Sequence, residues 1–264
     1  LGMSLLLTAA GPAAAADASS EGASAAAGMS GTGMTPAEEG KRDLPSEIRK
    51  AMSQLQDAVA LPSGKGMKAI KLGTRLFFVS GNGRLIIEGA AYDTWTGNAV
   101  STMDQAKRMA NFIAFDEMKV SLSDLDPLSF GNGGEQKRVV IATDPLCKEC
   151  RMLLDRIKNR PQLVKDYQFE ILLLPKSQES GPTVRRYFCA DDEVKALKAL
   201  FAGRAVRLEN PDQSCMSKEI ALRKRIATMY LLGLKKMPTV IAPNGRVHAG
   251  VPSDLTGFLE ENVE

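Results

Sequence analysis

The chain has 264 residues, of which 44% are hydrophobic and 25% charged, a composition that suits a globular protein with one large domain or two small ones. Its net charge of +3 is small, and no basic run is interleaved with aromatic residues, which argues against nucleic acid as a partner. Four cysteines and a single histidine leave few ligands for a metal site.

Residues 1–16, LGMSLLLTAAGPAAAA, are apolar and uncharged and end in small residues, as in a signal peptide cleaved after Ala16. The run is too short to span a bilayer, which takes about 20 residues. No basic residue precedes it, so we expect a truncated signal peptide; the alternative is an unstructured alanine-rich tail. Residues 17–43 are rich in Ala, Gly, Ser and Met, which predicts a flexible tether.

A small domain is expected over residues 44–100. The segment LPSEIRKAMSQLQDAVA predicts a helix, because four apolar residues recur at helical spacing: Ile48, Met52, Leu55 and Val59. KAIKLGTRLFFVS and RLIIEGAAYDTW are rich in β-formers, and the residues between them, Ser80-Gly81-Asn82-Gly83, predict a hairpin. A sheet of three or four strands needs a surface to pack against, and a second copy of the chain is one such surface.

A connecting segment is predicted over residues 101–134. TMDQAKRMANFIAFDEM, residues 102–118, is expected to be a helix with an apolar side formed by Met109, Phe112 and Ile113. The stretch SDLDPLSFGNGGEQ that follows is rich in helix and strand breakers, which places a domain boundary there.

Residues 135–264 show the element order of a thioredoxin-like domain. KRVVIAT predicts a buried strand, CKEC opens a helix, and YQFEILLLP predicts a second strand. A helical region over about 182–233, strands at PTVIAP and RVHAG, and a helix capped by Ser253 complete the chain. The predicted fold is therefore mixed, α+β or α/β, with an all-helical insertion in the second domain.

The motif Cys147-Lys148-Glu149-Cys150 begins the first helix of this domain. A thiolate at a helix N-terminus is stabilised by the unpaired backbone N–H groups and the helix dipole, so Cys147 is the expected nucleophile. Cys150 lies one turn further on, where it can attack the resulting mixed disulfide. Lys148 and Arg151 are expected to favour the thiolate, and Glu149 and Asp144 to oppose it. The alternatives are half of a zinc site and a purely structural bridge.

Cys189 and Cys215 lie in the helical insertion. Four cysteines allow three pairings, and a Cys147–Cys150 pair leaves these two together. In an exported protein they would be oxidised, and the bridge is expected to be structural. They do not have the spacing of a second zinc-binding pair. His248, in the predicted fourth strand, is expected to be an ordinary strand residue, and we expect neither a metal nor a cofactor.

These stretches together resemble the periplasmic thiol:disulfide interchange proteins of the DsbC/DsbG type. The similar segments run from about residue 62 to the C-terminus and include LFFVSGNGRLIIEGAAYD, TDPLCKEC, YFCADDEVKALKALFAGR and MPTVIAPNGRVHAG. The resemblance implies a homodimer joined through the N-terminal β-domain, with a linker helix to a thioredoxin-fold catalytic domain. It implies that Cys147 is the nucleophile, Cys150 the resolving cysteine, Cys189–Cys215 a structural disulfide and Pro238 a cis-proline facing the site.

Two positions depart from the family pattern. The isomerases usually carry a small or aromatic pair where this chain has Lys148 and Glu149, and threonine where Met237 precedes the proline. The expected function is a periplasmic disulfide isomerase acting on misoxidised client proteins and kept reduced by a membrane thiol reductase of the DsbD type. The alternatives are a thiol reductase that rescues oxidised single cysteines, and a chaperone-like binding dimer with minor redox activity.

Overall fold

The structure is a computed structural model that describes residues 46–53, 58–62, 66–118, 120–206, 215 and 218–263. The chain divides after Leu44, and all described residues belong to the unit Pro45–Glu264. The expected signal peptide, residues 1–16, and the expected tether, residues 17–43, lie outside the described residues.

The first part of the unit is a short helix, α1 (Ser46–Ser53), and a four-stranded antiparallel sheet. Its strands follow one another in chain order: β1 (Ala58–Ala60), β2 (Lys68–Leu72), β3 (Arg75–Val79) and β4 (Ile86–Glu88). The predicted hairpin joins β3 to β4, and Gly83 in its turn has φ +70°, a conformation that favours glycine. The helix predicted through Val59 is wrong at its end, because Val59 pairs with Ala69 of β2.

A two-stranded ladder and a helix come next: β5 (Ala91–Tyr92), β6 (Ala99–Val100) and α2 (Met103–Asn111). Thr102 and Gln105 form a reciprocal capping box at the start of α2. The helix predicted over 102–118 ends early, because Phe112 is extended and forms a β-bridge with Arg246. Three short 3₁₀ helices follow: η2 (Phe115–Glu117), η3 (Ser123–Leu125) and η4 (Glu135–Lys137).

The second sheet has five strands in the order β11-β10-β8-β9-β7. These are β11 (Val247–Ala249), β10 (Thr239–Ile241), β8 (Arg138–Thr143), β9 (Gln168–Leu173) and β7 (Leu128–Gly131). The central pair, β8 and β9, is parallel, and the other pairs are antiparallel. β7 falls within the segment assigned to the linker, so the sheet begins before residue 135; the breaker-rich flanks of this four-residue strand hide it in the sequence.

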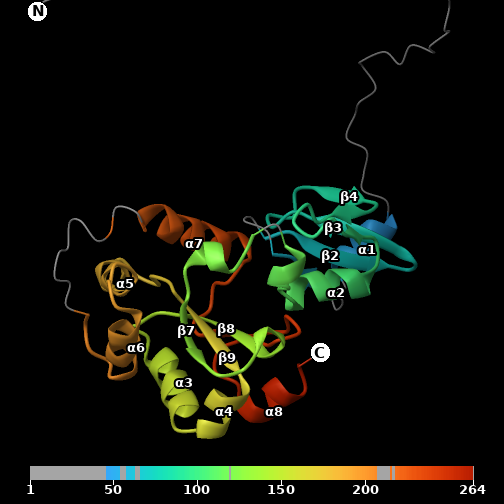
Figure 1. Cartoon of the computed structure of the whole chain (residues 1–264). Coiled ribbons are helices and arrows are strands. Elements are labelled where there is room, and N and C mark those ends of the chain that lie inside the picture. The colour runs from blue at the N-terminus through green and yellow to red at the C-terminus, as the bar shows by residue number, and fades with distance from the viewer. Residues whose placement is uncertain are drawn as a thin grey trace, which may run out of the picture. The chain divides into compact units, whose positions relative to one another are not determined.

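Helices cover both faces of this sheet, as in a thioredoxin-like domain (Figure 1). One face packs against α3 (Lys148–Lys158), α4 (Pro161–Asp166) and α8 (Leu255–Glu260). The other face packs against α7 (Glu219–Leu231) and the segment that contains η2 and η3. α8 is capped by Asp254, which accepts a hydrogen bond from the Gly257 N–H at 3.0 Å, and not by the predicted Ser253.

The described residues of the helical insertion form three helices, α5 (Ser180–Phe188), α6 (Glu193–Phe201) and α7, where the sequence predicted one helical region. Arg225 of α7 is buried and binds this insertion to the sheet. Its guanidinium donates to Leu125 O at 2.6 Å, to Leu173 O at 3.3 Å and to Asp126 O, and it stacks on the Phe188 ring at 4.5 Å. Burial lowers the pKa of Arg225 to about 10, while Asp126 opposes the shift, so the group remains a cation at neutral pH.

Candidate active site

The CKEC motif follows the central strand β8 directly. Thr143 ends the strand, Cys147 is the N-cap of α3, and the Cys147 N–H donates to Asp144 O at 3.0 Å. The Asp144 side chain is buried and accepts two backbone N–H groups, that of Leu146 at 2.7 Å and that of Lys176 at 2.6 Å. Asp144 therefore fixes the loop before Cys147 to the segment that follows β9, and its two oxygens are occupied by these contacts rather than directed at the sulfur.

The Cys147 thiol is partly exposed and lies between two polar groups. Its sulfur is 3.4 Å from a carboxylate oxygen of Glu149 and 3.8 Å from the main-chain oxygen of Met237. The Met237–Pro238 peptide bond is cis. The structure thus brings together two parts of the site that lie 90 positions apart in the chain. These are the motif residues Cys147 and Glu149 and the segment Met237–Pro238, all assigned to the site by sequence analysis.

Cys150 has a different environment, because only 1% of its surface is exposed. Burial raises the pKa of the Cys150 thiol from 9.0 to about 12. The Asp144 backbone N–H opposes this shift, the neighbouring Cys147 thiol adds to it, and the Thr143 hydroxyl opposes it. The pair is therefore asymmetric: Cys147 is accessible to a client, and Cys150 stays protonated behind it near neutral pH.

The charged side chains near the motif differ from the expected set. The pKa of Glu149 is lowered mainly by a hydrogen bond from its own backbone N–H and next by one from the Cys147 thiol. Lys176 and Lys148 make smaller contributions. Glu149 is thus an anion beside the sulfur. Arg151, expected to favour the thiolate, instead places its guanidinium against Gly203, just beyond the end of α6. Lys176, which follows β9, is a cation at this site that sequence analysis did not identify.

Thr143 is a second residue that sequence analysis missed. Its side chain is fully buried, and its hydroxyl is without a hydrogen-bond partner among the described residues. The hydroxyl nevertheless lies close enough to the Cys150 thiol to influence its pKa. The sequence contains only a weak signal for Thr143: it is a polar residue at the end of a buried, largely apolar strand, shortly before the motif.

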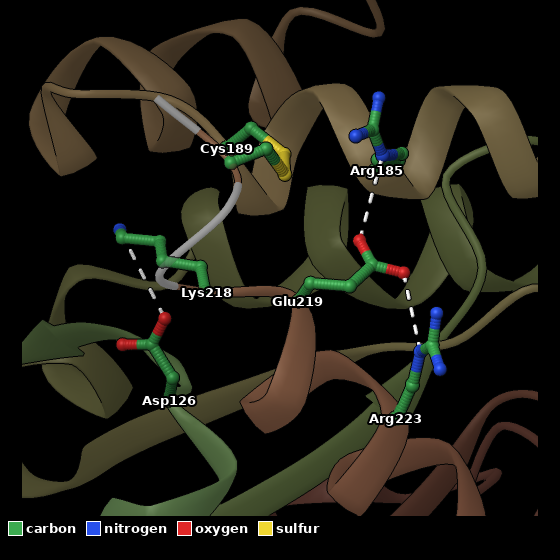
Figure 2. Close-up of a disulfide and its surroundings, with 7 residues drawn as sticks. Asp126, Arg185, Cys189, Lys218, Glu219 and Arg223 are labelled. Atoms are coloured by element: carbon green, nitrogen blue, oxygen red, sulfur yellow. Dashed lines mark hydrogen bonds and ion pairs between the residues drawn. A yellow bond between two sulfur atoms is a disulfide. The ribbon is translucent and has the colours of Figure 1, made fainter. Parts of the chain in front are cut away.

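The other two cysteines form a disulfide away from this site. Cys189 follows α5 and Cys215 precedes α7, and their Cα atoms are 4.9 Å apart. Ion pairs surround this link (Figure 2). Glu219 lies between Arg185 of α5, at 3.6 Å, and Arg223 of its own helix, at 3.4 Å.

His248 lies on β11, where a ring nitrogen is 3.3 Å from Gly250 O and the ring packs edge-on against Phe258. Within the described ranges, no three His, Cys, Asp or Glu side chains are grouped so that they could hold a metal ion. No helix in the same ranges is long and apolar enough to cross a membrane.

Comparison with known proteins gives sequence relatives but no matching family model. The chain is 23% identical over 202 residues to the thiol:disulfide interchange protein DsbC of Salmonella typhimurium, covering 75% of this chain and 78% of that protein. It is 21% identical over the same length to DsbC of Escherichia coli K12. Among solved structures, the disulfide interchange protein of Neisseria gonorrhoeae matches 55% of this chain at 17% identity, with a TM-score of 0.43. The resemblance to thiol:disulfide interchange proteins of the DsbC type is confirmed by the sequence matches.

Proposed function

We propose that this thiol-disulfide oxidoreductase, similar to DsbC over three quarters of its length, is an exported disulfide isomerase of misoxidised client proteins. The observation that carries the proposal is the asymmetry of the CKEC pair. A partly exposed sulfur stands at a helix N-terminus, and a buried thiol lies one turn behind it. The first can attack a protein disulfide, and the second is protected until a mixed disulfide has formed.

The reaction follows from these two environments. The Cys147 thiolate attacks one sulfur of a client disulfide, which forms a Cys147–client bond and releases the other client sulfur as a thiolate. In isomerisation, a client thiolate, formed directly or after exchange with another client disulfide, attacks the client sulfur of the mixed disulfide, and Cys147 leaves as a thiolate with no net redox change. In reduction, Cys150 attacks Cys147, the client leaves reduced, and the enzyme holds a Cys147–Cys150 disulfide.

The main-chain oxygen of Met237 and the carboxylate of Glu149 line the space beside the Cys147 sulfur. A client segment that approaches Cys147 therefore meets the cis-proline loop on one side and the first turn of α3 on the other. Leu146 and Met152 flank the motif with exposed apolar side chains, 55% and 45% exposed, that can contact a misfolded client.

We also propose that the protein acts as a dimer joined through its first sheet. Among the described strands, β4 pairs with β3 alone, so its other edge is open to another strand. Two large apolar side chains are exposed in or next to this strand, Leu85 at 59% and Ile87 at 51%, and a third, Tyr92 at 73%, lies in β5. An isologous contact here gives each dimer two CKEC sites.

Export to the periplasm is proposed with this function, together with a membrane thiol reductase of the DsbD type as electron donor. The Cys189–Cys215 disulfide suits an oxidising compartment. In such a compartment an isomerase needs a supply of electrons, because each reductive turnover leaves the CKEC pair oxidised.

Two assays on one set of variants test the isomerase. The wild type should refold a protein with scrambled disulfides and also reduce insulin when a dithiol is supplied. Cys150→Ala should lose most insulin reduction and keep part of the refolding activity, because rearrangement by client thiolates needs Cys147 alone. Cys147→Ala should lose both. Insulin reduction by the wild type without refolding would identify a simple reductase and contradict the proposal.

Substitution at the exposed edge tests the dimer. Ile87→Asp places a charge on β4 and should convert the full-length protein to a monomer in light scattering, with insulin reduction retained and refolding weakened. Val194→Asp is the matched control, because Val194 is 60% exposed but lies in α6. A wild type that is monomeric at micromolar concentration would contradict the shared dimer.

A further inference from the structure

The buried hydroxyl of Thr143 is not used by the fold. Its oxygen has no partner among the described residues, whereas the main-chain oxygen of Thr143 accepts from the Leu174 N–H at 2.8 Å. Buried polar groups are normally hydrogen-bonded, and one left unpaired destabilises the folded state. Valine has the same shape and carries no such group, so stability alone does not explain a threonine at this position.

The alternation of β8 directs this side chain towards the CKEC helix. Ile141 packs with Leu153 and Ile157 of α3, so the odd-numbered residues of β8 face that helix. Thr143 is the next residue in the alternation, and Cys150 of α3 packs in the same core cluster as Ala142, the residue directly before Thr143. The buried thiol therefore lies at the end of the strand that carries the hydroxyl, and the hydroxyl is close enough to influence the pKa of Cys150.

We propose that Thr143 is a catalytic residue of the release step: its hydroxyl donates a hydrogen bond to the Cys150 sulfur as that sulfur becomes a thiolate and attacks Cys147. The inference rests on the proposed function, because it assigns a role within the same exchange reaction. A threonine hydroxyl can rotate about its C–O bond, so its hydrogen can be aimed at an anion that forms only during reaction.

The step is balanced without a further reactant. Cys150 loses its proton to solvent, and its thiolate forms a bond to the Cys147 sulfur. The Cys147–client bond breaks, and the client leaves as a thiolate that takes up a proton from solvent. Two electrons pass from the CKEC pair to the client sulfurs. Thr143 keeps its own proton throughout and stabilises the sulfur that carries negative charge.

The groups around Cys150 leave this role to few candidates. Burial and the Cys147 thiol both disfavour a thiolate at Cys150, while the Asp144 backbone N–H and the Thr143 hydroxyl favour it. The Asp144 carboxylate is bound to the N–H groups of Leu146 and Lys176. Of the side chains that act on Cys150, the threonine thus supplies the neutral donor.

A single-turnover reaction with an aromatic disulfide reagent separates the two steps. The reduced full-length protein releases a first coloured thiolate when Cys147 attacks, and a second when Cys150 closes the internal disulfide. Thr143→Val should leave the first release unchanged and slow the second about tenfold or more, because a hydrogen bond to an anion is lost.

Three further variants make the result specific. Thr143→Ser keeps a hydroxyl and should release the second thiolate at nearly the wild-type rate, and Thr143→Ala should repeat the slow release if the valine variant does not fold. Thr228→Val removes another buried hydroxyl, in α7, and should change neither step. Thr143→Val should also melt at a higher temperature than the wild type, because an unpaired buried hydroxyl is removed.

A second release in Thr143→Val within about twofold of the wild type would overturn the inference, and so would a serine variant as slow as the valine variant. Failure of the proposed function is a different result. It would appear as a wild type without the first release, or as a Cys147→Ala variant that keeps it.

Discussion

The two cysteine pairs of this chain both lie near helix ends, but they differ in exposure, and Cys147 and Cys189 also differ in the polarity of the helix end. Cys147 is partly exposed at the N-terminus of α3, where the helix dipole favours a thiolate. Cys189 is fully buried at the C-terminus of α5, where the dipole disfavours one. The comparison indicates that placement on the fold, rather than the presence of a cysteine pair, separates a reactive pair from a structural one.

The surroundings of the two pairs differ in the same way. The Glu219–Arg185 ion pair joins α7 to α5, the helices next to the Cys189–Cys215 bridge, and Arg223 of α7 contacts the same carboxylate (Figure 2). Near Cys147 the side chains of Lys148, Glu149 and Lys176 are exposed, and the Glu149 carboxylate is directed at the sulfur. Ion pairs thus surround the Cys189–Cys215 disulfide, whereas the Cys147 sulfur is accessible to reaction partners.

The largest expected effect on activity follows from removing the exposed sulfur of Cys147. Cys147→Ala should abolish insulin reduction and the refolding of scrambled proteins, because Cys150 is buried and protonated near neutral pH. Alkylation of the reduced wild type by iodoacetamide, read by peptide mass mapping, should modify Cys147 before Cys150. Modification of Cys150 first would reverse the assignment of the two roles.

Removal of the other pair should affect stability and leave reactivity intact. The double variant Cys189→Ala/Cys215→Ala opens a loop with a sequence separation of 26 residues, which should lower the free energy of unfolding by about 3 kcal/mol. Urea unfolding with both proteins in the oxidised state measures this difference. Insulin reduction well below the melting transition should remain near the wild-type rate; a large loss there would mean that the bridge also shapes the CKEC site.

The pKa of Cys150 gives the comparison a pH dependence. Burial raises this pKa from 9.0 to about 12 in the folded protein, so the unfolded chain loses the proton first as the pH rises. The contribution of the buried thiol is fully present below pH 9.0 and is lost as the pH rises towards about 12. The free energy of unfolding of the reduced wild type should therefore fall relative to Cys150→Ala, by about 1 kcal/mol between pH 8 and pH 10.

Paired urea titrations of these two reduced proteins measure the difference, and other titrating groups cancel because both proteins share them. Equal pH dependence of wild type and Cys150→Ala would show that the thiol is solvated in the folded state.

The sequence predicted most of this fold, and the exceptions have a common cause. β8 and β9 are long runs of apolar β-formers, so their pattern identifies them. β7 and β1, which contains Val59, are short strands that exist only because they pair with other strands. β7 pairs with β9, which is distant in the sequence, and β1 pairs with β2, which is close to it in the sequence. Strand pairing of this kind is a tertiary property that local patterns do not contain.

The site divides in the same way. The CKEC motif and the Met237–Pro238 segment could be found from residue types and their order along the chain. The contacts of individual side chains could not: Asp144 binds backbone N–H groups, and Arg151 lies against Gly203. Thr143 was missed because an unpaired hydroxyl is defined by what surrounds it in space.

The smallest expected effect comes from the charge beside Cys147. Glu149 is an exposed anion whose carboxylate oxygen is 3.4 Å from the sulfur, so it opposes a thiolate there. Glu149→Gln should raise the rate of Cys147 alkylation near pH 7 about threefold, the size expected for one exposed charge pair. The gain should shrink in high salt, which screens exposed charges.

Two variants sharpen this last test. Lys148→Gln removes an exposed cation from the same turn and should slow alkylation by a similar or smaller factor. Glu193→Gln is the matched control, because it removes an exposed carboxylate from the first turn of α6 and should leave the rate unchanged. If Glu149→Gln has no effect at low salt, the hydrogen bond from the thiol to the carboxylate is not formed in the reduced protein. The unusual charged pair inside the motif would then act on the client rather than on Cys147.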